Sequence, residues 1–357
     1  MELRDLDDGA PVDLVLLVRA VSRRVRREGG EPFLKLELAD RSQTLPAIAW
    51  EDADEVSAFA VRGATVRVEG KIEVSERYGR QLAIGKLSPV PREQVDLSTL
   101  LEGPSVPVAE LEQRLAALIE RTRDGWTRRL LDLVFARDGA FWRRFREAPA
   151  AKFFHEAYPH GLLDHTVRVA EAVEALAPMF GGVDRDVAVA GALLHDIGKA
   201  QTYTTDPVAP DLTDLGRLEG HIVLGYEIVR RVIGKLDGFP EETARSIRHI
   251  VLSHHGKQEY GSPVVPATRE AVLVHHVDDL GARMGSFDRL QRGLAPEEQW
   301  SGYDRAIGSA AYFGPARREV EPLESVDPPP ADALAAAPAA VPDAVPATPP
   351  FEAPQAA

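Results

Sequence analysis

The chain of 357 residues contains no cysteine. This absence excludes a disulfide framework and any metal site built on thiolates, so a bound metal would need histidine and carboxylate ligands. No apolar run is long enough to span a bilayer, and the first residues, MELRDLDDGA, lack the charged and apolar regions of a signal peptide. We therefore expect a cytoplasmic protein that does not bind membranes.

Acidic residues outnumber basic residues, and the last part of the chain, from residue 319, has no basic residue. The formal net charge is −14 at pH 7, although the hydrophobic (44%) and charged (27%) contents are normal for a globular protein. From Glu319 onward the chain is acidic, rich in proline and alanine and poor in aromatic residues. Such a composition cannot bury enough surface to fold, so residues 319–357 are predicted to be a disordered acidic tail. The overall charge counts against nucleic-acid binding, but local basic patches matter more.

Histidine is absent from the first part of the chain, which instead has the pattern of β-strands. Apolar alternation predicts strands within 12–26, 32–42 and 44–50, and two or three more within 64–90, where Gly70 and Gly79 interrupt the pattern. Residues 51–63 fit one short helix. Five short strands with a helix in the middle predict a small β-barrel over residues 12–90, of which the OB-fold is the best-known type.

Basic and aromatic side chains accompany these predicted strands. Positive charge follows a phosphate backbone, and aromatic rings stack on bases, so the barrel is a candidate nucleic-acid-binding domain. The candidate residues are Arg24, Arg26, Phe33, Lys35, Trp50, Tyr78 and Arg80. In the alternative interpretation the arginines lie on a solvated hairpin and Trp50 lies in the core. OB-folds also bind other ligands, so this segment alone leaves both interpretations open.

Residues 91–106 carry several prolines and little periodicity, which is typical of a linker. Apolar residues then recur at helical spacing in 108–122, 126–135 and 140–148. We therefore expect an all-α domain over residues 107–318.

All ten histidines lie between His155 and His276. Several predicted helices each supply imidazole at an end or within an apolar stretch, and two of these segments supply carboxylates as well. This clustering favours a metal site over scattered core histidines. Imidazole and oxygen ligands without thiolate suit divalent Mn, Fe, Co, Ni or Zn.

The segment GALLHDIGKA places His195 and Asp196 side by side at the end of an apolar run. Adjacent side chains on a helix diverge by about 100°, so the two cannot share one amphipathic face. A divergent pair at a helix end can serve two metal positions, with the aspartate bridging both ions. Two divalent ions can clamp the attacking and leaving oxygens of a phosphoryl displacement and lower the pKa of bound water. The ions also offset the cost of burying the charge.

These residues carry a family resemblance. HTVRVAE, LLHDIGK, GHIVLG, SHHG and HHVDD, taken in order, resemble the motifs of HD-superfamily phosphohydrolases that bind two metals. The longer segments PAAKFFHEAYPHGLLDHTVRVAE and LSHHGKQEYGSPVVPATREAVLVHHVDDLGARM resemble the YhaM family of 3′-5′ exoribonucleases. That family places an OB-fold ahead of its HD domain, so the resemblance covers about residues 10–315.

The resemblance implies a set of metal ligands and catalytic residues. The core ligands would be His165, His195, Asp196 and Asp278, and the ligands of a second metal would be His221, His254 and His255. Asp278 is preferred to Asp279 because its position in HHVDD matches the family's ligand. Two divalent ions per chain are expected, with Mn²⁺ favoured. Asp196 and Lys199 are the expected catalytic residues, since Lys199 is similar to a lysine that contacts phosphate; the alternative role for Lys199 is a helix C-terminal cap.

The remaining histidines are expected to have supporting roles. His155 and His160 precede the first ligand and could bind substrate or groups around the metals, whereas His249, His275 and His276 are expected to pack or to support ligands. One residue departs from the family. Glu156 stands where the family usually has a second histidine, which could alter the surroundings of the metal or the metal preference.

The resemblance implies a metal-dependent 3′-5′ exoribonuclease that hydrolyses single-stranded RNA, with single-stranded DNA as a further candidate, to nucleoside 5′-monophosphates. One alternative is an HD phosphohydrolase of small nucleotides or cyclic dinucleotides, although HHGKQEYGSP lacks the GYP signature of cyclic-di-GMP enzymes. Another is a non-catalytic nucleic-acid-binding factor, which would not need so full a ligand set. A homo-oligomer is also expected.

Overall fold

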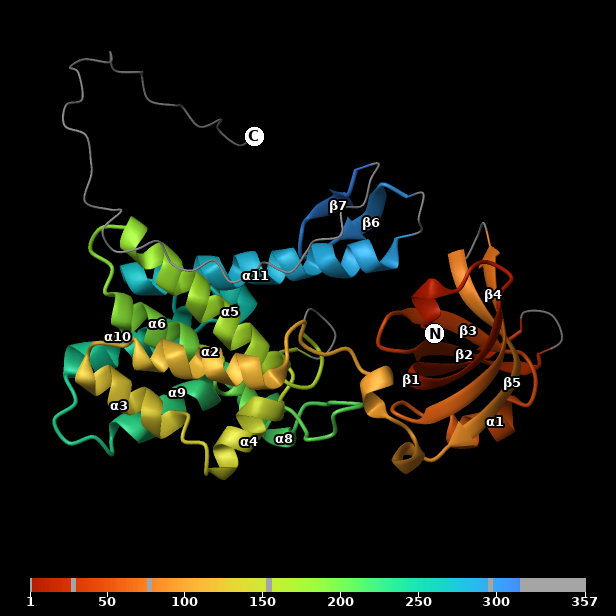
Figure 1. Ribbon diagram of the computed structural model, residues 1–357, viewed down its shortest axis with the longest axis horizontal. Coiled ribbons are helices and arrows are strands. Elements are labelled where there is room, and N and C mark those ends of the chain that lie inside the picture. The colour runs from red at the N-terminus through yellow and green to blue at the C-terminus, as the bar shows by residue number, and fades with distance from the viewer. Residues whose placement is uncertain (1, 27–29, 76–78, 152–155, 295–297, 315–357) are drawn as a thin grey trace, which may run out of the picture. The chain divides into compact units, whose positions relative to one another are not determined.

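The computed structural model describes residues 2–26, 30–75, 79–151, 156–294 and 298–314 (Figure 1). The predicted tail of residues 319–357 lies outside these ranges, as do Tyr78 and His155. Among the described residues, no helix is both long enough and apolar enough to cross a membrane.

The N-terminal region is a closed five-stranded barrel in the order β1-β2-β3-β5-β4. Its strands are β1 (Pro11–Val25), β2 (Pro32–Ala39), β3 (Thr44–Ala49), β4 (Thr65–Ser75) and β5 (Gly79–Val90). Helix α1 (Ala53–Phe59) connects β3 to β4. Strands β3 and β5 pair in parallel, and the other neighbours are antiparallel. This is the arrangement of an OB-fold, so the predicted fold of this region is confirmed.

Strand β1 closes the barrel because it pairs with both β2 and β4. Its first half, from Pro11 to Leu17, pairs with β4, and its second half pairs with β2. An irregularity in the pairing with β2, between Val18 and Ala20, lies just after the last residue of β1 that pairs with β4. A bulge of this kind bends a strand and increases its twist, which lets one strand continue from one side of the barrel to the other.

Gly70 does not separate two strands, because β4 runs through it. A Cβ at this position would lie 2.1 Å from the carbonyl oxygen of Ala83 on β5. The glycine therefore allows the backbones of β4 and β5 to approach at a register irregularity between Glu69 and Gly70.

Residues 91–106, the predicted linker, contain the short 3-10 helices η2 (Arg92–Gln94) and η3 (Leu97–Thr99). The helical region that follows is as expected from the apolar spacing. Its helices are α2 (Val108–Glu120), α3 (Gly125–Val134), α4 (Ala140–Glu147), α5 (Gly161–Leu176), α6 (Arg185–Leu194), α7 (Lys199–Thr202), α8 (Asp214–Leu218), α9 (Gly220–Ile233), α10 (Glu241–Ser253) and α11 (Arg269–Gly293). Two further 3-10 helices are η4 (Ala177–Met179) and η5 (Gln258–Tyr260).

Helix α6 lies at the centre of this region. Its residues from Asp186 to Leu194 are all buried, because α5, α10 and α11 pack around it. The sequence VAVAGALL offers only small and aliphatic side chains to these neighbours. A Cβ on Gly191 would lie 2.3 Å from Cδ1 of Ile250, so the glycine lets α10 pack closely against α6.

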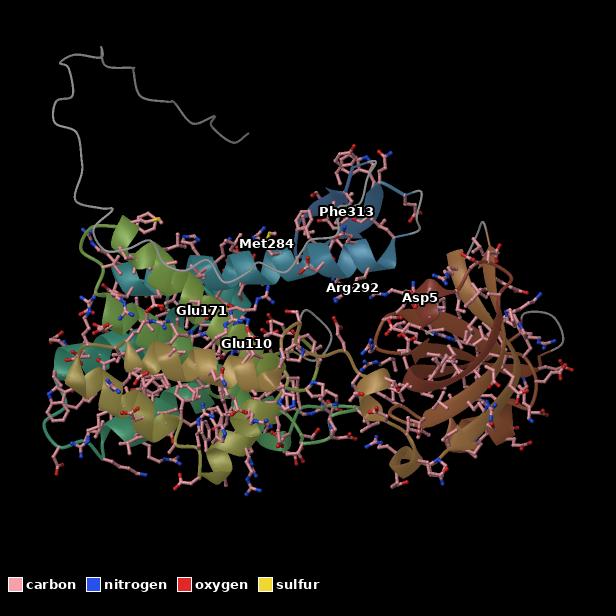
Figure 2. The ribbon with its side chains drawn as sticks, viewed as in Figure 1. Asp5, Glu110, Glu171, Met284, Arg292 and Phe313 are labelled. Carbon is pink, nitrogen blue, oxygen red and sulfur yellow. The ribbon has the colours of Figure 1, made fainter. Side chains whose placement is uncertain are left out.

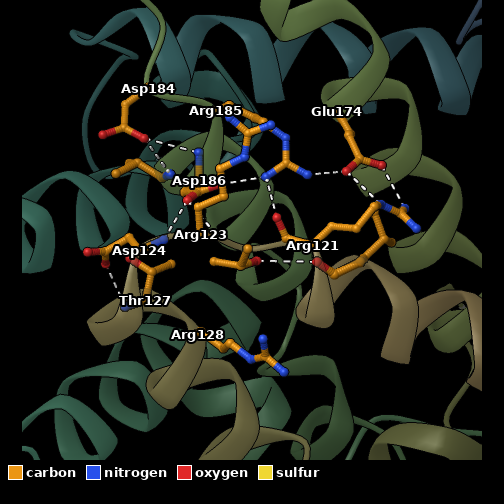
Figure 3. Close-up of polar contacts among 12 residues, drawn as sticks. Arg121, Arg123, Asp124, Thr127, Arg128, Glu174, Asp184, Arg185 and Asp186 are labelled. Carbon is orange, nitrogen blue, oxygen red and sulfur yellow. Dashed lines mark hydrogen bonds and ion pairs between the residues drawn. The ribbon is translucent and has the colours of Figure 1, made fainter. Parts of the chain in front are cut away.

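Ion pairs and caps fix the N-terminal end of α6 (Figure 3). Glu174 of α5 accepts hydrogen bonds from Arg121, at 3.0 and 2.7 Å, and from Arg185. Asp186 accepts from the backbone N–H groups of Arg123 and Asp124, both at 2.7 Å. These contacts join α6 to α5 and to the turn between α2 and α3, so the two central helices are held in a fixed relation.

The helical region ends in a β-hairpin, which the expectation of an all-α domain to residue 318 did not include. Strands β6 (Trp300–Asp304) and β7 (Ser309–Tyr312) pair in antiparallel fashion after α11. Ala311 is buried, and Phe313 packs its ring against Phe287 of α11 with the centroids 6.1 Å apart (Figure 2). The two strands are only five and four residues long, so they give little signal in the sequence. The hairpin also depends on a tertiary contact with α11, which local sequence patterns do not report.

Candidate metal centre and nucleic-acid face

Five long helices bring the seven predicted metal ligands together. His165 lies on α5, His195 and Asp196 follow α6, His221 lies on α9, His254 and His255 follow α10, and Asp278 lies on α11. Ligand atoms within 4.8 Å of one another form two groups. We call the group of His165, His195 and Asp278 the first group, and that of His221, His254 and His255 the second group.

Asp196 lies between the two groups. Its Oδ2 is 3.4 Å from Nε2 of both His165 and His195 in the first group. Its Oδ1 is 3.4 Å from Nε2 of His221 and 3.5 Å from Nε2 of His254 in the second group. One oxygen of a single carboxylate therefore faces each group, which is the arrangement required of a bridging ligand.

The buried polar atoms of the centre fit divalent cations. Among the described residues, Asp196 Oδ1, His221 Nε2 and His254 Nε2 are buried and have no hydrogen-bond partner. A buried polar atom without a partner costs free energy, and these three lie close together. A cation would satisfy all three at once, because each can offer a lone pair.

The end of α6 explains how adjacent residues both face the centre. The helix ends at Leu194, so His195 and Asp196 lie in a tight turn in which the N–H of Ile197 bonds to the carbonyl of Leu194. The side chains of His195 and Asp196 are almost fully buried. The divergence that would be unfavourable in a regular amphipathic helix here directs both side chains to ligand positions.

Backbone carbonyls set the tautomer of three of the histidines. Nδ1 of His195 is 2.7 Å from the carbonyl oxygen of Ala192, and Nδ1 of His254 is 2.9 Å from that of Val251. Nδ1 of His255 is 2.7 Å from the carbonyl oxygen of residue 260. A carbonyl only accepts, so each Nδ1 is the donor and each Nε2 keeps its lone pair for a metal.

Burial favours the metal-binding form of two histidines of the second group. It lowers the pKa of His254 to about 4 and the pKa of His221 well below its ordinary value. Both imidazoles are therefore neutral at neutral pH, and neutral imidazole is the form that binds metal.

The two aspartates are ionised. Burial alone would raise the pKa of Asp196, but Lys199 and His195 lower it well below its usual range. Burial also opposes ionisation of Asp278, but His165 and His195 together outweigh it and lower the pKa of Asp278. Anionic oxygens in a buried site suit a cation.

Lys199 reaches the centre from the first residue of α7. Its Nζ is 2.6 Å from Oδ2 of Asp196, and its side chain is largely buried. Burial opposes its charge, but Asp196 raises the pKa of Lys199, so the ammonium group is positively charged beside the bridging carboxylate.

Three of the other histidines bind backbone groups. Nδ1 of His160 donates to the carbonyl of Arg146 at 2.7 Å, and Nε2 of His249 accepts from the N–H of Ala267 at 2.8 Å. His275 donates from Nδ1 to the carbonyl of His254 at 2.7 Å, and its ring fills the space that a Cβ on Gly256 would occupy. His275 thus supports the loop that carries two of the candidate ligands.

Glu156 is a contact of the centre that the sequence analysis did not include among the site residues. Its Oε2 lies 2.8 Å from Nδ1 of His165, and both side chains are buried. Burial alone would lower the pKa of His165, but Glu156, together with Asp196 and Asp278, raises it well above the ordinary value. The only signal in the sequence was the departure from the family at this position.

On the barrel, most of the candidate nucleic-acid-binding residues share one outer face. Arg24 and Phe33 are paired across β1 and β2, and Lys35 follows two residues after Phe33 on the same side. The rings of Phe33 and Trp50 have their centroids 5.0 Å apart, and Arg26 lies over the Trp50 ring at 5.1 Å. Trp50 is 50% exposed, so the alternative that it lies in the core is wrong.

Arg80 lies apart from this outer face. It is two residues from the buried Leu82 on β5, so it points toward the interior side of the barrel. Its guanidinium group donates to the carbonyl oxygens of Leu3, at 2.9 Å, and of Leu6. The structure thus assigns Arg80 to holding the N-terminal segment on the barrel.

Comparisons with known proteins identify a domain family and relatives of this chain. The HD domain family matches residues 162–283. The 3′-5′ exoribonuclease YhaM of Bacillus subtilis is 32% identical to this chain, over 81% of this chain and 90% of that protein. The 3′-5′ exoribonuclease YhaM of Halalkalibacterium halodurans is 31% identical, over 86% of this chain and 94% of that protein.

A solved structure also matches. The second OB-fold domain of replication protein A from Methanococcus maripaludis covers 27% of this chain and 98% of that chain, with 15% identity and a TM-score of 0.21.

Proposed function

The chain belongs to the YhaM family of 3′-5′ exoribonucleases, and from this premise we propose that it is itself a metal-dependent 3′-5′ exoribonuclease. Its substrate would be single-stranded RNA and its products nucleoside 5′-monophosphates. The observation that carries the proposal is the carboxylate of Asp196, which directs one oxygen to each of two buried groups of imidazoles.

In this proposal the seven residues of the centre hold two divalent cations. His165, His195 and Asp278 would hold one, the second group would hold the other, and Asp196 would contribute an oxygen to each. Imidazole and carboxylate donors suit Mn²⁺, which we favour, as well as Fe, Co, Ni and Zn. Two bound divalent ions would lower the pKa of the attacking water and stabilise the attacking and leaving oxygens.

The chain's own residues prepare this chemistry. The lone pairs at Nε2 of His195, His254 and His255 are kept available because each Nδ1 donates to a carbonyl. Lys199 places a positive charge 2.6 Å from the bridging carboxylate, where it would contact a non-bridging oxygen of the scissile phosphate. Because its hydrogen-bond partner is Asp196, Lys199 would also orient the bridge.

The outer face of the barrel would bind the strand. Phe33 and Trp50 would stack on bases, while Arg24 and Lys35 contact phosphates. Stacking and phosphate contacts do not depend on the 2′-hydroxyl, so single-stranded DNA is a further expected ligand. An RNA substrate favours a cytoplasmic location, and the expected homo-oligomer stays a prediction.

Hydrolysis of small nucleotides is the less favoured function. Both exoribonuclease relatives align over more than four-fifths of this chain, and the barrel has an exposed aromatic and basic face. A small nucleotide would not need such a face, whereas a polymeric strand would.

RNA labelled at its 5′ end will shorten stepwise when the protein and Mn²⁺ are added. Attack from the 3′ end leaves the label on the remaining strand until the last steps, so a ladder is expected on a denaturing gel. Immediate release of labelled mononucleotide would mean the opposite polarity, and internal fragments would mean an endonuclease. A cyclic dinucleotide and a mononucleotide, assayed in parallel, should not be hydrolysed.

Replacing both Phe33 and Trp50 with alanine will weaken binding to long single-stranded RNA by about tenfold or more, since stacking contributes about 1–3 kcal/mol per base. Binding is measured by fluorescence anisotropy, with thermal unfolding as the test of the fold. Phe180→Ala is the matched control, because this ring is also about half exposed but lies in the helical region. Unchanged affinity in the double variant would show that Phe33 and Trp50 do not stack on the bases of the bound strand.

A further inference from the structure

His165 differs from three other candidate ligands in the group that faces its Nδ1. Three candidate ligands donate from Nδ1 to carbonyl oxygens, whereas Nδ1 of His165 faces a carboxylate oxygen at 2.8 Å. On its other side, Nε2 of His165 lies 3.2 Å from Asp278 Oδ1 and 3.4 Å from Asp196 Oδ2. The imidazole thus connects Glu156 to the metal-binding atoms.

The backbone of Glu156 is held in a conformation that glutamate rarely adopts. Its φ is +58°, in the left-handed region. The carbonyl oxygen of Glu156 accepts the N–H of Ala150 at 3.0 Å, and a Cβ on Gly161 would lie 2.1 Å from the same oxygen. Strained backbone of this kind persists where its surroundings impose it, and it concentrates at functional sites.

The side chain of Glu156 is fixed from two directions. Oε2 faces His165, while Oε1 accepts a hydrogen bond from Arg168 at 3.2 Å. Arg168 lies on α5, about one turn after His165. Arg168 is about half exposed, whereas the Glu156 side chain is only 9% exposed. The carboxylate is therefore buried. Its outer oxygen is paired with the cation of Arg168, and its inner oxygen faces the candidate ligand His165.

We propose that Glu156 is a positioning residue that holds His165 in the metal-binding tautomer and strengthens metal binding at the first group. A carboxylate that accepts from Nδ1 fixes the ring orientation and makes Nε2 a stronger donor. Glu156 places its carboxylate oxygen 2.8 Å from Nδ1 of His165, where it can act in this way. The inference rests on the metal centre of the proposed function and adds a residue to it.

Two variants separate the carboxylate from the fold. Glu156→Gln keeps the size of the side chain and an acceptor oxygen but removes the charge. Glu156→Gly removes the side chain and suits the left-handed backbone, so it is expected to fold. Glu171→Gln is the matched control, because Glu171 is likewise a carboxylate paired with an arginine, but it lies on α5 and contacts Arg114 instead of a candidate metal ligand.

The measurement is Mn²⁺ affinity by calorimetry on the full chain in the absence of RNA, with thermal unfolding of the metal-free protein alongside. We expect Glu156→Gly to weaken the affinity of one metal position by about 10- to 100-fold, Glu156→Gln to weaken it less, and Glu171→Gln to leave it unchanged. Hydrolysis by Glu156→Gln should return to the wild-type rate at saturating Mn²⁺.

Mn²⁺ affinity within twofold of wild type in Glu156→Gly would overturn the inference. So would a rise in the KM for RNA that persists at saturating Mn²⁺, because Glu156 would then act on the substrate. Since calorimetry needs no RNA cleavage, a protein that binds Mn²⁺ through Glu156 but degrades no RNA would contradict the proposed function and leave this inference standing.

Discussion

Asparagine in place of Asp196 will abolish RNA hydrolysis while the protein remains folded. The amide has the size of the carboxylate but only one oxygen acceptor and no charge, so it cannot direct an anionic oxygen to each group of histidines. The loss removes electrostatic stabilisation from both cations, and we expect activity to fall by about 10³-fold or more. Elemental analysis should show less metal per chain than in the wild type.

Asp279→Asn is the matched control for this substitution. Asp279 is next to the candidate ligand Asp278, but it is partly exposed and pairs with Arg283 at 2.6 Å on the surface of α11. Its replacement should leave both metal content and hydrolysis unchanged. A fully active Asp196→Asn enzyme would rule out the bridging role, and loss of metal in Asp279→Asn would show that the wrong aspartate of the pair was chosen.

The arrangement of the candidate ligands was largely predictable from the sequence. The motifs around His165, His195 and His221 each contain a histidine beside apolar residues, and such residues are forced inward when helices pack. Helices packed around α6 must bring these imidazoles toward its end. The position of Asp196 was also predictable, because a buried carboxylate next to an imidazole needs a cation or a partner.

The support from Glu156 was not predictable in the same way. Its contact with His165 depends on a left-handed turn, and no periodicity in the sequence reports such a turn. Arg80 shows a similar limit. Composition placed it with the basic residues of the barrel, but its carbonyl partners belong to Leu3 and Leu6, more than seventy residues earlier in the chain. The hairpin after α11 also depends on packing between distant residues.

Alanine in place of Gly198 will disrupt the metal centre without replacing any candidate ligand. A Cβ at this position would lie 2.0 Å from the carbonyl oxygen of His221 and 2.6 Å from the backbone nitrogen of Gly225, both on α9. Backbone atoms cannot yield as the end of a flexible side chain does, so α9 must move away from the turn after α6. We expect a loss of about 1–3 kcal/mol in the free energy of unfolding, as for other overpacked sites.

This movement should impair catalysis more than stability. His221 is the second residue of α9, so its Nε2 would leave its place 3.4 Å from Asp196 Oδ1. A displacement of about 1 Å at a reacting centre can cost about 10²-fold in rate, and we expect at least that loss of RNA hydrolysis. Urea unfolding, metal content and the hydrolysis rate are measured together.

Gly281→Ala is the matched control, because Gly281 lies within α11 and has no atom within 4 Å of its would-be Cβ. Alanine in a helix interior is favoured over glycine by about 1 kcal/mol, so this variant should be at least as stable as the wild type and fully active. If Gly198→Ala also kept full activity and metal content, close packing of α9 on the turn after α6 would not be what holds His221 in the centre.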